Sequence, residues 1–123
     1  MDRIDEITIE LQTKLENAHE SLEKCKRGMV HLRSQFTKPV ESYDEQVQSY
    51  ITQVDKVLNL LPSFSAGVKS LQEFFENEDF DDVDELEKAA HTVRTDILPT
   101  VEKIELLSQA IFTNLGMNLD DFA

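Results

Sequence analysis

Apolar residues recur at intervals of three and four along almost the whole of this 123-residue chain. The mean interval is about 3.6 residues, the period of an α-helix, so the apolar side chains of each segment share one helix face. The first series is Ile4, Ile7, Leu11, Leu15, Ala18, Leu22, Cys25, Met29, Leu32 and Phe36. This pattern predicts a helix over residues 2–36 whose apolar stripe is as narrow as a coiled-coil seam.

A second helix is predicted over residues 40–76, after a break at Thr37–Pro39. Pro62 lies within it, and a proline either ends a helix or kinks it. The apolar spacing continues in phase past Pro62, which a chain reversal has no reason to preserve. We therefore expect a kinked, continuous helix, with two separate helices as the alternative.

A third helix is predicted over residues 82–115, with Asp81 or Asp82 as its N-cap. Pro99 lies inside its apolar series and favours a kink for the same reason. Gly116 directly follows the last residue of the series, and glycine readily adopts the left-handed conformation that ends helices. The series is Leu86, Ala90, Val93, Ile97, Val101, Ile104, Leu107, Ile111 and Leu115.

The composition supports a fold of few, long elements. Only three Gly and three Pro are present, too few for the many turns of a β-sandwich or barrel. We predict an all-α protein: an elongated, coiled-coil-like, up-down-up three-helix bundle over residues 1–116, followed by a short acidic and apolar tail, residues 117–123. Gly28 lies inside the first helix at a cost of about 1 kcal/mol relative to Ala, so either a neighbouring helix approaches closely there or the helix bends.

The charge is concentrated in the last part of the chain. Residues 76–123 contain thirteen acidic and three basic residues, and the whole chain has a net charge of −13. This balance disfavours nucleic acids and anionic membranes as partners. The single cysteine suits a reducing compartment, and neither a signal peptide nor a membrane-inserted segment is apparent. We expect a protein of the cytoplasm or the nucleus.

The densest acidic stretch, Glu76–Glu87, has eight acidic residues in twelve positions. It does not match an EF-hand loop, because the required Gly and the final Glu are missing in either register. Part of the charge is explained by the N-terminus of the third helix, where carboxylates are favoured. The remainder is either solubilising surface or a docking site for a basic segment of a partner.

No constellation of catalytic, cofactor-binding or metal-binding residues is apparent. His19, His31 and His91 lack the spacing that places two ligands on one helix face. Cys25 occupies a seam position between Leu22 and Met29, which indicates packing more than catalysis. We expect no enzymatic activity and no cofactor.

With no catalytic or cofactor-binding site apparent, the activity left to this chain is association with other proteins. We predict a non-enzymatic interaction or scaffold subunit of a hetero-oligomeric helical complex, comparable in class to small subunits of trafficking, cytoskeletal, kinetochore or transcription-coactivator complexes. The alternative is a stand-alone acidic module or chaperone that covers a basic protein surface. Whether the first helix packs within the chain or against a partner is left open. The candidate partner-binding residues are Leu15, Leu22, Met29, Phe80, Leu119 and Phe122.

Overall fold

The computed structural model describes residues 3–77 and 82–123, and these are helical almost throughout, without a β-strand. The predicted all-α class is therefore confirmed. In chain order the elements are α1 (Arg3–Gln35), the 3-10 turn η1 (Val40–Ser42), α2 (Glu45–Asn77), α3 (Val83–Thr92), the π-helical turn η2 (Val93–Ile97), α4 (Leu98–Asn114) and the 3-10 turn η3 (Leu119–Phe122).

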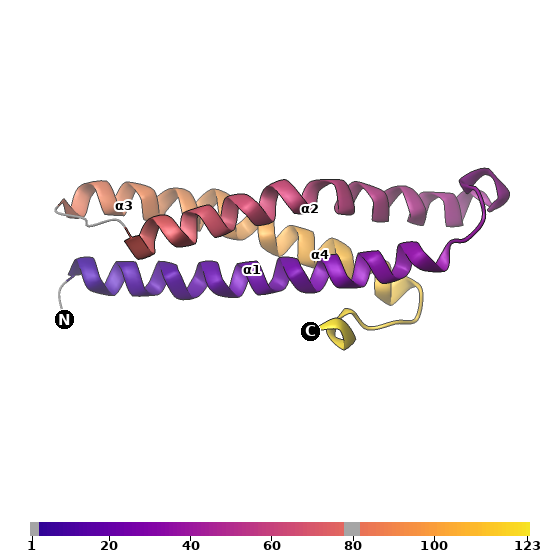
Figure 1. Cartoon of the computed structure of the whole chain (residues 1–123), viewed down its shortest axis with the longest axis horizontal. Coiled ribbons are helices and arrows are strands. Elements are labelled where there is room, and N and C mark those ends of the chain that lie inside the picture. The colour runs from indigo at the N-terminus through magenta and orange to yellow at the C-terminus, as the bar shows by residue number, and fades with distance from the viewer. Residues whose placement is uncertain (1–2, 78–81) are drawn as a thin grey trace.

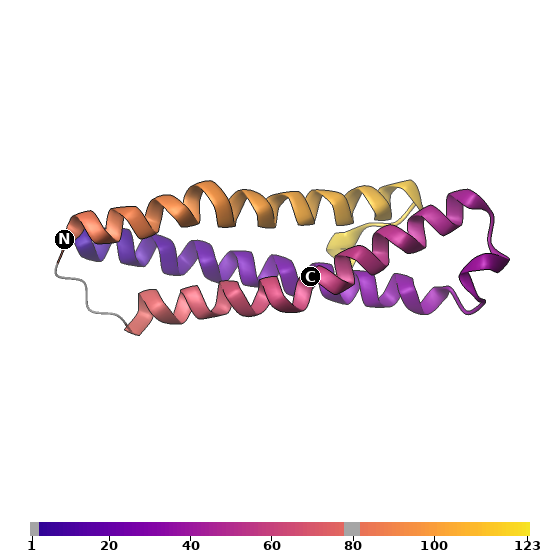
Figure 2. The ribbon, with the colours of Figure 1, turned by 90° about the horizontal axis from the view of Figure 1, so that it is seen from above.

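Helix α1 is the element on which the others pack. It makes most of its contacts with α2 and the next most with α4, whereas α2 and α4 contact each other little. Figure 1 shows α2 running back along α1, and α3 and α4 running in the same direction as α1. Helix α1, helix α2 and the stretch that α3 and α4 form lie side by side when the molecule is seen from above (Figure 2).

The predicted apolar seam of α1 forms the centre of the core. Its members are buried from the second turn to the last turn of the helix, because helical spacing keeps them on the side that α2, α3 and α4 cover. The buried seam residues are Ile7, Leu11, Leu15, Ala18, Leu22, Cys25, Met29 and Leu32.

Helix α2 begins five residues later than the sequence predicts. Tyr43 leaves the helical path and folds back onto the end of α1, where its ring lies edge-on to Phe36 at 5.6 Å and its hydroxyl accepts a hydrogen bond from the Lys38 amide at 3.1 Å. Asp44 then caps the helix by accepting a hydrogen bond from the Val47 amide at 2.9 Å. The helix continues through Pro62 without ending there. A bend at this proline stays a prediction.

Helices α3 and α4 form one helical stretch through η2. Asp82, one of the two caps that the sequence predicts, caps α3, since its Oδ1 accepts a hydrogen bond from the Asp84 amide at 2.9 Å. Pro99 lies in the first turn of α4, directly after the π-helical turn. A proline in an α-helix clashes with the carbonyl four residues earlier, here that of Thr95, and the wider turn η2 lies where that clash would occur.

The buried face of α4 differs from the predicted one in its second half. Leu107 and Leu115 are exposed, whereas Ser108 and Phe112 are buried. The Ser108 hydroxyl is satisfied by donating a hydrogen bond to the Ile104 carbonyl at 2.8 Å. The face turns because α4 here packs against residues 117–123 as well as against α1.

Helix α4 ends at the predicted glycine. Gly116 has a φ of +74°, its amide donates to the Thr113 carbonyl at 3.0 Å, and the Met117 amide donates to the Phe112 carbonyl at 2.8 Å. This pair of hydrogen bonds is the Schellman motif. It reverses the chain and directs residues 117–123 back towards α1 (Figure 1).

Candidate binding surfaces

Most of the predicted partner-binding residues lie in the chain's own core. Leu15, Leu22 and Met29 are buried on α1 beneath the other helices, and Leu119 is buried too. Phe80 lies outside the described residues. In this conformation the buried side chains are covered by their own chain, so their contact with a partner stays a prediction.

Gly28 accommodates the close approach of Leu119. A Cβ atom added at Gly28 would lie 2.6 Å from Leu119 Cδ1 and 3.0 Å from the ring of Phe112. Leu119 is 0% exposed. Of the two explanations for Gly28 that the sequence left open, the close approach of a neighbouring helix holds through Phe112 of α4, but the nearest atom belongs to Leu119, which the sequence did not predict at this place. The approaching segment is η3, together with α4.

Polar side chains of α1 hold the same segment. Lys24 Nζ lies 3.1 Å from Asp120 Oδ1 and 3.2 Å from Glu105 Oε1, so one ammonium joins α1, α4 and η3. Burial works to lower the pKa of Lys24, but the hydrogen bonds to Asp120 and Glu105 outweigh it and raise the pKa above its ordinary value. Arg27 Nε donates a hydrogen bond to the Phe122 carbonyl at 2.7 Å.

The ring of Phe122 completes the contact. Its centroid lies 5.0 Å from the His31 imidazole and 5.5 Å from the Phe112 ring. Phe122 is half-buried and packs against the edge of the core. We name the residues that hold this segment the tail-docking site: Lys24, Arg27, Gly28 and His31 of α1, with Phe112 of α4.

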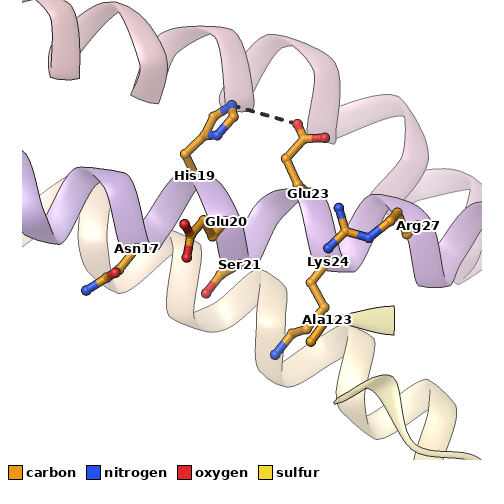
Figure 3. Close-up of a pocket in the computed structure, with 8 residues that line it drawn as sticks. All are labelled: Asn17, His19, Glu20, Ser21, Glu23, Lys24, Arg27 and Ala123. Atoms are coloured by element: carbon orange, nitrogen blue, oxygen red, sulfur yellow. Dashed lines mark ion pairs between the residues drawn. The ribbon is translucent and has the colours of Figure 1, made fainter. Parts of the chain in front are cut away.

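A shallow hollow of about 620 Å³ lies on the outer face of α1 beside this site. Figure 3 shows His19 and Glu23 reaching towards α2, with His19 Nε2 3.8 Å from Glu23 Oε1, while Ser21 points towards α4. The lining is a mixture of acidic, basic and amide side chains of α1, together with Ala123. Such a surface offers polar contacts but does not enclose a substrate.

The chain's one thiol is not placed for chemistry. Cys25 is fully buried, and burial raises the pKa of its thiol, opposed in part by a hydrogen bond with Ser108. Because the thiolate is the nucleophile, a protonated thiol in the core is unreactive. Among residues 3–77 and 82–123, no group of three or more His, Cys, Asp and Glu side chains is close enough to hold a metal ion.

Two further ion pairs join α1 to the third helical stretch. Arg3 Nη2 lies 3.0 Å from Glu87 Oε1, and Arg94 Nη2 lies 2.9 Å from Glu10 Oε2. The partners are 84 residues apart in both pairs, as expected for two helices that run in the same direction in register. These pairs are not predictable from the sequence pattern, because spacing within one helix gives no signal for charges on another.

A second apolar stripe lies on the flank of α2. Leu60, Phe64, Gly67 and Leu71 follow one another at steps of four, three and four, so they share a helix face. Leu60 is 48% exposed, while Phe64 and Leu71 are half-buried against the edge of the core. Apart from its chain neighbours and the adjacent backbone of its own helix, a Cβ atom at Gly67 would meet no atom of the described residues within 4 Å. We name these four residues the α2 stripe.

Comparison with known proteins adds no assignment. No protein-family model, no curated protein and no solved structure matches this chain. No helix in the described ranges combines the length and the apolar character that crossing a bilayer requires. The function must therefore be inferred from the surfaces of the chain itself.

Proposed function

We propose that this chain is a non-enzymatic interaction subunit of a hetero-oligomeric helical complex, acting from the cytoplasm or the nucleus. Its three helices form an up-down-up bundle that serves as a rigid scaffold. The bundle presents the α2 stripe to an amphipathic helix of a partner subunit. Binding of one helix against the apolar face of another is a common mode of recognition between proteins.

The observation that carries this proposal is the α2 stripe with Gly67 at its centre. A glycine in a helix interior costs about 1 kcal/mol relative to alanine. At Gly28 a close approach within the chain accounts for that cost, whereas at Gly67 the space above the backbone is open. A partner helix that packs its side chains between Leu60 and Leu71 would fill that space and approach the backbone closely.

The helix-on-helix mode also agrees with the shape of the chain. Its long elements offer extended faces, and the hollow on α1 is lined by mixed charges. Apolar side chains on an extended face bury against a second helix more readily than they bind a small molecule, which generally requires a concave pocket.

Affinity capture with stripe variants tests the proposal. The bait is the full chain, carrying Leu60→Asp, Gly67→Gln or the control Ile9→Asp. Ile9 is 50% exposed, close to the 48% of Leu60, but lies on α1 opposite its buried seam. We expect a helical partner in stoichiometric amount with wild type and Ile9→Asp, and its loss with both stripe variants, while circular dichroism shows all four chains equally helical.

Two results would contradict the proposal. One is a stoichiometric partner that the stripe variants retain. The other is a partner that is basic, dissociates at high salt and is lost on neutralising Glu76, Glu78 and Asp79, since that result favours the acidic module over the helical subunit.

A further inference from the structure

Residues 119–122 lie on α1 in the manner of a bound peptide. The residues that hold them belong to two other elements, α1 and α4. The connection to α4 is short and turns at Gly116, whose left-handed φ reverses the chain. The segment is therefore held by contacts from outside itself, as a bound peptide is, and its release would uncover the buried side chain of Leu119 and the faces of α1 and α4 beneath it.

Each of these contacts recognises a different chemical group of the segment. The notch above Gly28 admits the branched side chain of Leu119 and would be filled by any side chain at position 28. Lys24 pairs with the carboxylate of Asp120. Arg27 binds a backbone carbonyl, and His31 with Phe112 contacts the ring of Phe122. The tail-docking site therefore recognises leucine, then an acidic residue, then an aromatic residue three positions after the leucine.

The tail-docking site offers positive charge, although the net charge of the molecule is negative. The chain has a net charge of −13, so its long-range field repels an acidic peptide. At the site, two cations, Lys24 and Arg27, lie one turn apart on α1 and face the segment. An acidic peptide that binds here is held by local pairing and not by the overall field.

We propose that the tail-docking site is a peptide-binding site, which residues 119–122 occupy in cis and which a short segment of another protein with the pattern Leu-acid-x-Phe occupies in trans. The incoming segment displaces the chain's own tail. This inference goes beyond the α2 stripe, because it concerns another face and another kind of partner, and it holds whether or not the stripe binds a helix.

A fluorescent peptide with the sequence of residues 117–123, acetylated at its N-terminus, tests the proposal. It is titrated into the full chain carrying Leu119→Ser, which leaves the notch vacant, and into wild type. We expect saturable binding to Leu119→Ser and at least ten-fold weaker binding to wild type, because a tethered tail competes at a high effective concentration.

Two controls distinguish binding at the tail-docking site from nonspecific binding of the peptide. The double variant Gly28→Ala with Leu119→Ser fills the notch and is expected to lose binding. A peptide with Asp120→Lys is expected to bind more weakly at Lys24, although the field of an acidic chain would strengthen its attraction. Binding that survives Gly28→Ala, or that improves with Asp120→Lys, overturns the proposal.

A measurement on the wild-type chain covers the case in which Leu119→Ser does not fold. The methyl resonances of Leu119 report on docking, because the ring of Phe112 lies beside the same notch. Unlabelled peptide at millimolar concentration is expected to move them towards the positions of a solvated leucine. Unchanged resonances overturn the proposal, as does a wild-type dimer that the peptide dissociates, since the occupant would then be the tail of a second copy.

Discussion

Two helical glycines in this chain have opposite surroundings. Gly28 lies on the buried side of α1, where the positions of Leu119 and Phe112 leave no room for a Cβ atom. Gly67 lies on α2, where a Cβ atom would enter open space. The backbone cost of a helical glycine is the same at both positions, but only at Gly28 does a contact within the chain offset it.

Alanine at the two positions is therefore expected to change stability in opposite directions. Gly67→Ala should raise the free energy of unfolding by about 0.5–1 kcal/mol, because it lowers the entropy of the unfolded chain without a clash. Gly28→Ala should lower it by about 1–3 kcal/mol, the usual cost of overpacking a core. Urea denaturation of both full-length variants measures the two values. A stabilising Gly28→Ala would contradict the close packing of Leu119 and Phe112 over this position.

At the scale of the elements, ion pairs accompany the packing of α1 on the third helical stretch. The carboxylate of Glu10 pairs with two cations, 2.9 Å from Lys14 on its own helix and 2.9 Å from Arg94 of η2. The pKa of Glu10 is lowered, first by the hydrogen bond with Lys14 and then by Arg94, against an opposing effect of burial. Ion pairs as exposed as these each contribute less than about 1 kcal/mol to the stability of the fold. They therefore help to align the two helices more than they stabilise them.

Glu10→Gln is expected to flatten the loss of stability in acid. A carboxylate whose pKa is lower in the folded state stabilises the fold above its unfolded pKa, and that contribution disappears as pH falls through the folded value. Wild type should therefore lose its advantage over Glu10→Gln as the pH falls below about 4, where carboxylates become protonated. Thermal melts between pH 7 and pH 3 measure this. Glu16→Gln, an exposed carboxylate on the same helix, is the control.

At the scale of the whole molecule, the core is continuous and α1 belongs to every part of it. The seam of α1 contacts α2 along its length, α3 near its N-terminus, and α4 and η3 towards its C-terminus. The first helix therefore packs within its own chain, which the sequence left open. A defect in the middle of this seam is expected to affect all the helices at once.

Leu22→Asp should accordingly unfold the chain. Leu22 is 1% exposed, and an unpaired charge in that place costs several kcal/mol, comparable to the 5–15 kcal/mol that stabilises a typical domain. Circular dichroism is expected to show lost helicity or a broad, low melting transition, while Ile9→Asp on the outer face melts like wild type. A folded Leu22→Asp chain would mean that the seam is not the centre of the core.

The features that could be predicted from the sequence are those that depend on residues close together in the chain. The seam of α1, the cap at Asp82 and the stop at Gly116 each depend on residues within a few positions of one another. The seam and the stop were predicted correctly, and Asp82 was one of the two predicted caps. The late start of α2 was not predicted, because Tyr43 leaves the helix for a contact with Phe36 at the end of α1.

Tertiary structure decided which segments meet. The pairing of Glu10 with Arg94, the choice of Phe112 over Leu115 for the core and the docking of Leu119 above Gly28 each join residues or faces that are remote in sequence. A helical period places a side chain on a face, but it does not carry the register between two helices. That register comes from the joint packing of all the elements, which no local pattern contains.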